Sequence, residues 1–218
     1  MAGGEGSPVR TVLVVGVIAI AAALLISTSY ELTRDRIAAN ARARLLESLS
    51  SVLPEELRGS DLATVRLSAT DPELLGSPGP IDVFVVGPRG SPAAVVFASV
   101  APNGYNAPIQ LLIGLTPDGT VTGVRAVGHR ETPGLGDAIE IGKSRWITQF
   151  DGTSLANPEF WAVDRDDGPF DTMTGATVTS RAVVDAVHDT LRYFSMHRDA
   201  LFAEAAAAPQ ADPADVAP

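Results

Sequence analysis

Residues 109–127 have the sequence IQLLIGLTPDGTVTGVRAV, in which the β-rich runs Ile109–Thr116 and Thr120–Val127 flank a Pro-Asp-Gly triplet. A proline that presets the turn, followed by Asp-Gly, is typical of a β-hairpin. Two earlier β-rich runs, Ile81–Val86 and Ala93–Val100, are separated by Gly-Pro-Arg-Gly. The four runs together predict an antiparallel sheet.

Helical patterns surround these strands, so an α+β fold is expected. Apolar residues recur at helical spacing over about Ser180–His197, which predicts the last helix. Another helix is expected around Asp137–Phe150, interrupted near Gly142. The run Leu32–Leu53 also has apolar residues at three- and four-residue spacing and ends at Pro54, which indicates a stalk or a helix that packs on the following domain.

These elements divide the chain into four parts. Residues 1–30 form an N-terminal segment with a long apolar run, and residues 31–80 form a helical stalk and a connector with room for a short strand. Residues 81–202 form the main folded domain. Residues 203–218 contain mostly Ala, Pro and Asp, with few large apolar side chains, which predicts disorder.

The apolar run Thr11–Tyr30 carries no charge over 20 residues. A helix of this length rises about 30 Å, the thickness of the hydrocarbon core, so a single transmembrane helix is expected. A cleaved signal peptide is the alternative, with Arg10 as its charged region and Ser27-Thr28-Ser29 near its cleavage site, but the run is longer than the usual ~7–15-residue signal core. Arginines after the run favour a cytoplasmic domain, yet long domains cross with little regard to charge, so the orientation stays open.

The composition excludes several classes of cofactor and partner. The 218 residues have a formal net charge of −10 and include no cysteine, which excludes Cys-ligated iron–sulfur clusters, thioether-linked haem and disulfides. Lys143 is the only lysine, and no basic patch with interleaved aromatics occurs, so no nucleic-acid partner is expected. A redox role therefore needs a cofactor that requires no thiol, and a hydroxyl-linked flavin is one.

The sequence DTMTGATVTS, residues 171–180, places hydroxyl side chains around a Gly-Ala pair just before the last helix. Asp171 followed by Thr174–Thr177 resembles the flavinylation motif, in which the last threonine carries FMN through a phosphoester. A threonine hydroxyl does not attack phosphorus unaided, so attachment needs a separate flavin transferase and a divalent metal. Gly175 and Ala176 keep the approach open, and a helix start favours an anion. Ordinary helix capping by hydroxyl groups is the alternative interpretation.

Three further segments precede this motif in order. They are GYNAPI at Gly104–Ile109, GHRETPGLG at Gly128–Gly136, and Trp146-Ile147 with Phe150. Together with the motif they resemble the G subunit of the Rnf (Rsx) ion-translocating electron transport complex, and the architecture is similar to that of the C subunit of the sodium-pumping NADH:quinone oxidoreductase. The resemblance covers the apolar run and about Val95–Phe194.

The resemblance implies one N-terminal transmembrane helix that anchors an FMN-binding domain on the periplasmic side of the bacterial inner membrane. It implies that residues 81–202 are this domain and that FMN is attached covalently to Thr177. The complex would couple electron transfer between ferredoxin and NAD to ion movement. This protein would relay electrons, with the other subunits as partners and no small-molecule substrate of its own, rather than act as an enzyme alone.

By the same resemblance, the Glu131–Gly136 loop borders the flavin. Leu135 would pack on the ring, and Glu131 and Thr132 would be polar partners of the ring or the ribityl chain. A plain Gly-Pro turn is the alternative. The expected cofactor-binding residues are Thr177, Asp171, Thr174, Gly175, Ala176, Thr179, Ser180, Glu131, Thr132 and Leu135.

The remaining residues that could form a functional site give weaker evidence of one. The three histidines lack metal-ligand spacing, and the acidic run Asp164–Asp171 departs from the EF-hand pattern at Gly168, so no metal site is expected. Trp146 and Trp161 are expected in the core or an interface. Two alternative functions are an extracytoplasmic flavin-binding sensor or regulatory domain, and a structural membrane protein whose motif only begins a helix.

Overall fold

A computed structural model of the chain describes residues 12–13, 15–20, 22–23, 47–57, 64–88 and 90–208. The chain divides into two units, Met1–Arg44 with Ala217–Pro218, and Leu45–Val216. In the first unit the described residues are helical. The expected span Thr11–Tyr30 lies partly outside the described residues, and no helix within the described ranges has the length and apolar character that a membrane crossing needs.

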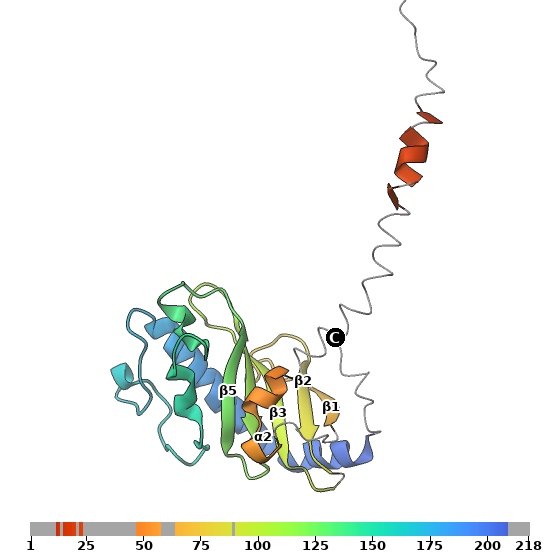
Figure 1. Ribbon diagram of the computed structural model, residues 1–218. Coiled ribbons are helices and arrows are strands. Elements are labelled where there is room, and N and C mark those ends of the chain that lie inside the picture. The colour runs from red at the N-terminus through yellow and green to blue at the C-terminus, as the bar shows by residue number, and fades with distance from the viewer. Residues whose placement is uncertain are drawn as a thin grey trace, which may run out of the picture. The chain divides into compact units, whose positions relative to one another are not determined.

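The second unit is built on a five-stranded antiparallel sheet in the order β1-β2-β3-β4-β5 (Figure 1). Each strand pairs with its neighbour in the sequence, as a chain of hairpins does. The predicted hairpin around the Pro-Asp-Gly turn is confirmed, since Thr116 N donates to Thr120 O at 2.8 Å and Gly119 has a φ of 90°. The strands are β1 (Thr64–Ala69), β2 (Ile81–Val86), β3 (Ala94–Ala101), β4 (Ile109–Leu115) and β5 (Val121–Gly128).

One face of the sheet packs against α2 (Thr177–Ala207), a helix of 31 residues. Phe97 of β3 is central to this core, because its ring meets Tyr193 and Phe194 of α2 edge-on, with centroids 6.0 and 6.1 Å apart. Val183 and Val187 are also completely buried here. This packing fixes the position of α2 on the sheet, and so the place where the motif of residues 171–180 enters the helix.

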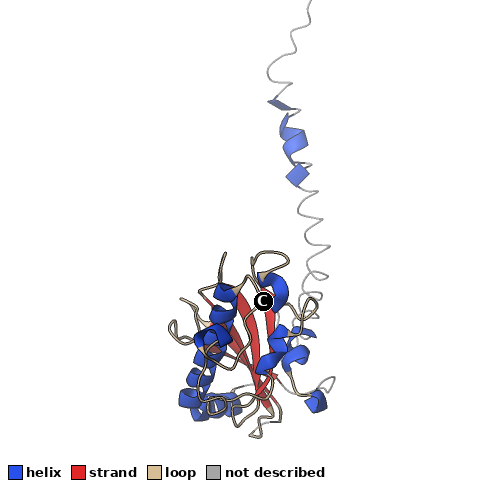
Figure 2. Cartoon of the chain, turned by 90° about the vertical axis from the view of Figure 1, so that its left-hand side faces the viewer, coloured by secondary structure: helices blue, strands red, loops and turns tan. Residues whose placement is uncertain are grey.

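The other face of the sheet is covered by residues 47–57, which end in the short 3-10 helix η1 (Glu55–Leu57), so that helical segments flank both faces (Figure 2). Residues 47–52 are helical, which confirms the end of the helix expected over Leu32–Leu53; its earlier part lies outside the described residues. A second, smaller core lies between this segment and the sheet: Leu49, Val52, Leu53, Phe84, Val86, Ala94, Val96 and Leu112.

The connecting regions differ from expectation. The helix expected around Asp137–Phe150, with an interruption near Gly142, consists of two short 3-10 helices, η2 (Gly136–Ile139) and η3 (Trp146–Phe150). The interruption is confirmed, but neither part is an α-helix. The Ser144 hydroxyl donates to Ala138 O and accepts from Trp146 N, so a side chain takes hydrogen bonds that a continuous helix would make. A third, η4 (Asp164–Asp166), lies in the acidic run.

The last helix is longer than predicted at both ends. It begins at Thr177, inside the motif, and continues to Ala207. Residues 203–207 therefore belong to α2, although disorder was predicted from residue 203. Leu201 and Ala205 are buried and extend the apolar stripe, which explains the extra turns. Residues 209–218 lie outside the described part of the chain.

Candidate functional site

The expected flavin-attachment segment is a loop that turns into α2. Gly175 has a φ of 80°, a left-handed conformation that glycine adopts without strain. Ala176 is the N-cap of α2, so the helix start has no side-chain cap, and its first turn carries no acidic residue. The first N–H groups of a helix have no intrahelical acceptor, so this end of α2 suits an anion that replaces the missing cap.

The hydroxyl groups of the segment differ in their surroundings. Thr179 and Ser180 are completely buried. The Ser180 hydroxyl donates to Ala176 O and accepts from Met173 N, both at 3.0 Å. The Thr172 hydroxyl donates to Asp164 Oδ1. Among the described residues, the Thr174 and Thr177 hydroxyls have no hydrogen-bond partner; Thr174 is exposed and Thr177 is half-buried.

Glu131 joins three segments that are distant in the sequence. Its carboxylate is buried, accepts a hydrogen bond from the Thr179 hydroxyl and accepts another from Asn106 N at 3.3 Å. The Asn106 side chain also donates to Arg130 O at 2.9 Å. The GYN segment, the ETPGLG loop and the start of α2 therefore meet at one carboxylate.

The ETPGLG loop lies against the motif. Leu135 at its tip is 44% exposed, and a Cβ placed on Gly175 would lie 3.0 Å from its Cδ2 atom. Thr132 O accepts from Leu135 N and Gly136 N, each at 3.1 Å, which closes the loop as a tight turn. Leu135 is thus an exposed apolar side chain directly beside the Gly-Ala pair.

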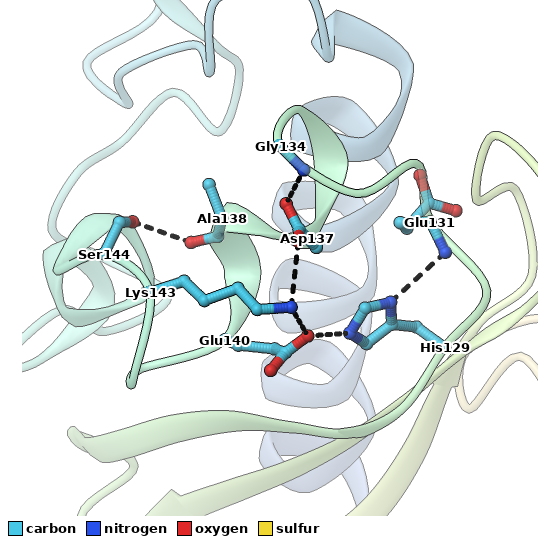
Figure 3. A network of polar contacts seen from close by, with 8 residues as sticks. All are labelled: His129, Glu131, Gly134, Asp137, Ala138, Glu140, Lys143 and Ser144. Atoms are coloured by element: carbon cyan, nitrogen blue, oxygen red, sulfur yellow. Dashed lines mark hydrogen bonds and ion pairs between the residues drawn. The ribbon is translucent and has the colours of Figure 1, made fainter.

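A network of polar contacts links the ETPGLG loop to the residues that follow it (Figure 3). Lys143 Nζ lies 2.8 Å from Asp137 Oδ2 and 2.5 Å from Glu140 Oε1, and Asp137 Oδ1 accepts from Gly134 N at 2.8 Å. The hydrogen bond from Lys143 lowers the pKa of both the Asp137 and the Glu140 carboxyl groups. His129 Nδ1 accepts from Glu131 N at 3.2 Å, so its ring proton lies on Nε2, which faces Glu140 Oε1 at 3.1 Å.

Asp171, the first residue of the motif, is held by its backbone. Its N–H donates to Gln149 Oε1 and its carbonyl accepts from Trp146 Nε1, both at 2.7 Å. No described residue pairs with its carboxylate, and the residue is exposed. Trp146 is thus an anchor of the motif, whereas Trp161 lies in the core, as expected for a structural tryptophan.

The acidic run next to the motif is occupied by its own contacts. Arg181 forms a two-pronged salt bridge with Asp166, with both N–O distances 2.6 Å, and this hydrogen bonding lowers the pKa of Asp166. Asp164 accepts from Thr172. Within the described residues, no group of three or more histidine and carboxylate side chains is placed to hold a metal ion.

The structure thus brings together most of the residues that the sequence singled out. Five residues that make hydrogen bonds or ion pairs around this site could not be assigned that role from the sequence. They are Asn106, His129, Glu140, Lys143 and Gln149. Asn106 and His129 stood in segments on which the resemblance rests. The others are single polar residues whose contacts depend on the fold.

The comparisons with known proteins agree with this geometry. Residues 104–192 match the FMN-binding domain, which contains β4, β5, the ETPGLG loop and the start of α2. Fold and site therefore define an FMN-binding-domain protein. Residues 7–52 match the RnfG N-terminal region, and the chain belongs to the family of G subunits of the ion-translocating oxidoreductase complex.

The similarity to relatives extends over nearly the whole chain. The G subunit of the ion-translocating oxidoreductase complex of Pseudomonas aeruginosa is 42% identical over 204 residues, or 93% of this chain and 95% of that protein. Its counterpart in Aliivibrio fischeri is 37% identical over 194 residues, or 88% and 92%. The crystal structure of the C subunit of Na(+)-translocating NADH-quinone reductase from Parabacteroides distasonis shares the fold, with a TM-score of 0.50, 19% identity, and coverage of 75% of this chain and 94% of that one.

Proposed function

We propose that the protein carries FMN on Thr177 through a phosphoester and relays electrons as a membrane-anchored subunit of an ion-translocating oxidoreductase complex. The observation that carries this proposal is the state of the Thr177 hydroxyl. It lies on the first residue of α2, at a helix end without a side-chain cap, and has no hydrogen-bond partner among the described residues.

The surroundings favour Thr177 over the other hydroxyls of the motif. Thr179 is 1% exposed and its hydroxyl is bonded to Glu131, so a transferase has no access to it. Thr174 is exposed but lies in the turn before the helix, where no helical N–H groups are aligned. Thr177 alone combines an unbonded hydroxyl with the positive end of α2.

The residues around Thr177 fit a bound FMN phosphate. A phosphate ester at the first helical residue would meet the unpaired N–H groups of the first turn, the contacts that an N-cap side chain makes in other helices. Gly175, in its left-handed conformation, leaves no side chain between the backbone and an approaching group. When bound, the flavin supplies a ring that accepts and passes on electrons.

The ETPGLG loop would then serve two purposes. Leu135 is exposed beside Gly175 and is the loop residue placed to contact the ring. Thr132 receives a hydrogen bond from Asn106 Nδ2 at 3.4 Å, and Glu131 is bonded to Thr179 and Asn106. We therefore assign these two residues to the support of the site.

The membrane and complex assignments follow from the family. We propose that the apolar run Thr11–Tyr30 is a single retained anchor and that the FMN domain lies on the periplasmic side of the bacterial inner membrane. The partners are the other subunits of the complex, which couples ferredoxin and NAD electron transfer to ion movement, and a flavin transferase for maturation.

The experiment compares Thr177→Ala with its matched control Thr174→Ala, each produced with an active flavin transferase. Flavin fluorescence is then measured in a denaturing gel. The proposal predicts a fluorescent band for the wild type and for Thr174→Ala, and none for Thr177→Ala. Fluorescence that survives in Thr177→Ala and disappears in Thr174→Ala would move the attachment to Thr174. A wild-type band without flavin, beside a labelled control protein, would overturn the covalent carrier.

A further inference from the structure

We propose that Glu131 is a positioning residue for flavin attachment, whose buried carboxylate sets the rotation of the first turn of α2 so that Thr177 faces outward. This inference rests on the proposed function, because it concerns how Thr177 is presented to the transferase. The ordinary expectation for a polar residue in a flavin-bordering loop is contact with the ring. In this structure the carboxylate is turned away from solvent and is bonded to the helix.

The contact between Glu131 and Thr179 holds one side of the helix start against the domain. Successive residues of an α-helix are about 100° apart, so Thr179 and Thr177 lie about 200° apart, on nearly opposite sides. With Thr179 bound to Glu131 inside, Thr177 points outward, and their burial agrees, with Thr179 buried and Thr177 half-buried. A different rotation of this turn would move the acceptor hydroxyl.

The fold leaves room for this carboxylate at two glycines. A Cβ on Gly136 would lie 2.9 Å from both Glu131 Oε2 and Thr179 Oγ1, and a Cβ on Gly104 would lie 3.1 Å from Glu131 Oε1. Both glycines belong to the segments that carry the family resemblance. Any larger residue at position 136 would separate the two partners.

Glu131 is itself held in place. Its N–H donates to His129 Nδ1, and His129 in turn faces Glu140, which is paired with the only lysine of the chain (Figure 3). Its carboxylate has no ion-pair partner among the described residues and is stabilised by hydrogen bonds from Asn106 and Thr179 instead. Because hydrogen bonds hold both the backbone and the side chain of Glu131, its carboxylate is suited to hold Thr179 in place.

The reaction itself shows why this rotation matters. The phosphate of free FMN is not activated, so the donor must be a flavin dinucleotide, in which the flavin-side phosphorus is part of an anhydride. A bond forms between Thr177 Oγ and that phosphorus, the anhydride P–O bond breaks, and a nucleoside monophosphate leaves. The hydroxyl proton passes to a base of the transferase, and no electron is exchanged. In-line attack requires the hydroxyl to be correctly aimed, and small misplacements cost large factors in rate.

The test measures the initial rate of flavin incorporation into the full-length protein, with a purified transferase, its divalent metal and FAD. The variant Thr179→Val removes the hydroxyl that binds Glu131 but keeps the side-chain shape, and Thr179→Ser restores the hydroxyl. The matched control is Thr190→Val, which removes another completely buried hydroxyl from the same helix, one bonded to Ser99 and Ala186. Thermal unfolding of each unmodified protein is recorded beside the rates.

The inference predicts that Thr179→Val slows incorporation about tenfold or more, that Thr179→Ser restores the rate, and that Thr190→Val labels like the wild type despite a similar loss of thermal stability. In a Glu131→Gln background, Thr179→Val should slow the reaction much less, because the pair is already disturbed. Equal rates for Thr179→Val and Thr190→Val would overturn the role of Glu131 and leave Thr177 as the attachment site. Absence of flavin from the wild type would instead overturn the proposed function.

Discussion

The indole N–H of Trp146 donates a 2.7 Å hydrogen bond to the backbone carbonyl of Asp171, 25 residues later in the chain. Gln149, from the same 3-10 helix, accepts the N–H of Asp171. Both backbone polar groups of Asp171 are thus fixed by η3, and the residue is exposed. The start of the proposed flavin-attachment motif is ordered by a helix that lies outside the motif.

The variant Trp146→Phe tests this anchoring. It keeps an aromatic ring near Phe150, whose centroid lies 5.7 Å from that of Trp146, but removes the N–H donor. Loss of the hydrogen bond should lower the free energy of unfolding by about 0.5–1.5 kcal/mol, and the looser Asp171 should slow flavin incorporation. Denaturant unfolding and the incorporation rate check the two effects. An unchanged rate would show that Asp171 is presented without help from Trp146.

Gly175 gives a second prediction, with Gly134 as its matched control. Both glycines have positive φ values, 80° and 78°, but a Cβ at Gly175 would lie 3.0 Å from Leu135 Cδ2, whereas one at Gly134 meets nothing within 4 Å. Each change to alanine should cost about 1–3 kcal/mol of unfolding free energy through backbone strain. Only Gly175→Ala should also displace Leu135 and reduce flavin incorporation. Equal incorporation in both variants would contradict the contact between Leu135 and the motif.

A third prediction concerns the segment that precedes the sheet. Gly114 and Gly123 face each other across β4 and β5, and Val52 lies against them. A Cβ on Gly114 would lie 2.3 Å from Val52 O, which also accepts a hydrogen bond from the Thr122 hydroxyl. A Cβ on Gly123 would lie 3.2 Å from Val52 Cα, a milder contact.

Gly114→Ala should therefore push residues 47–53 off the sheet and lower the free energy of unfolding by about 1–3 kcal/mol. Gly123→Ala should cost less. Hydrogen exchange of residues 47–53 in the detergent-solubilised full chain measures the displacement directly. Protection that is unchanged in Gly114→Ala would mean that this segment does not depend on its contact with the glycine pair.

Stability should also depend on pH through His188. Its ring stacks on Trp161 with centroids 5.4 Å apart, and burial lowers its pKa below the ordinary value of 6.5, while the nearby Asp185 and Asp189 raise it and Arg192 lowers it. The unfolded chain therefore binds a proton more readily than the folded one. The stability that the neutral ring provides is present above pH 6.5 and is lost as the pH falls below it.

The variant His188→Phe keeps an aromatic ring beside Trp161 but cannot titrate. Between pH 7.5 and 5.5 its unfolding free energy should fall less than that of the wild type. Denaturant unfolding at the two pH values provides the comparison. Parallel decreases in both proteins would show that another group is responsible. Asp185, whose pKa is raised by burial, acts in the opposite direction, since its contribution is lost as the pH rises.

Local signals in the sequence were sufficient for four of the five strands, whereas β1 was expected only as a short strand for which the connector had room. The Pro-Asp-Gly turn predicts the β4–β5 hairpin because proline and glycine restrict the backbone directly. The apolar stripe predicts α2 because apolar residues at helical spacing form one face that can pack on the sheet. Its extension to Ala207 was missed because Ala-rich turns carry few large side chains, although alanine favours helix and Leu201 and Ala205 pack on the core.

Contacts between distant residues could not be predicted in the same way. Ile139, Ile147 and Phe150 are buried and gave the region 137–150 an apolar content typical of a helix, but the Ser144 side chain interrupts the helical hydrogen bonding. Glu131 and Thr179 are 48 residues apart, and nothing in either local sequence indicates the bond between them. Thr179 was expected to face the cofactor, and only the fold shows that it faces inward.

The most direct test of the central claim is the mass of the tryptic peptide Asp166–Arg181, taken from the wild-type chain produced with an active flavin transferase. Cleavage after Arg165 and Arg181 isolates every hydroxyl of the motif in this one peptide. We predict an added mass of one FMN less one water, with fragment ions that place it on Thr177. An unmodified peptide from a preparation in which a control protein is flavinylated, or fragment ions that place the flavin on another hydroxyl, would contradict the claim.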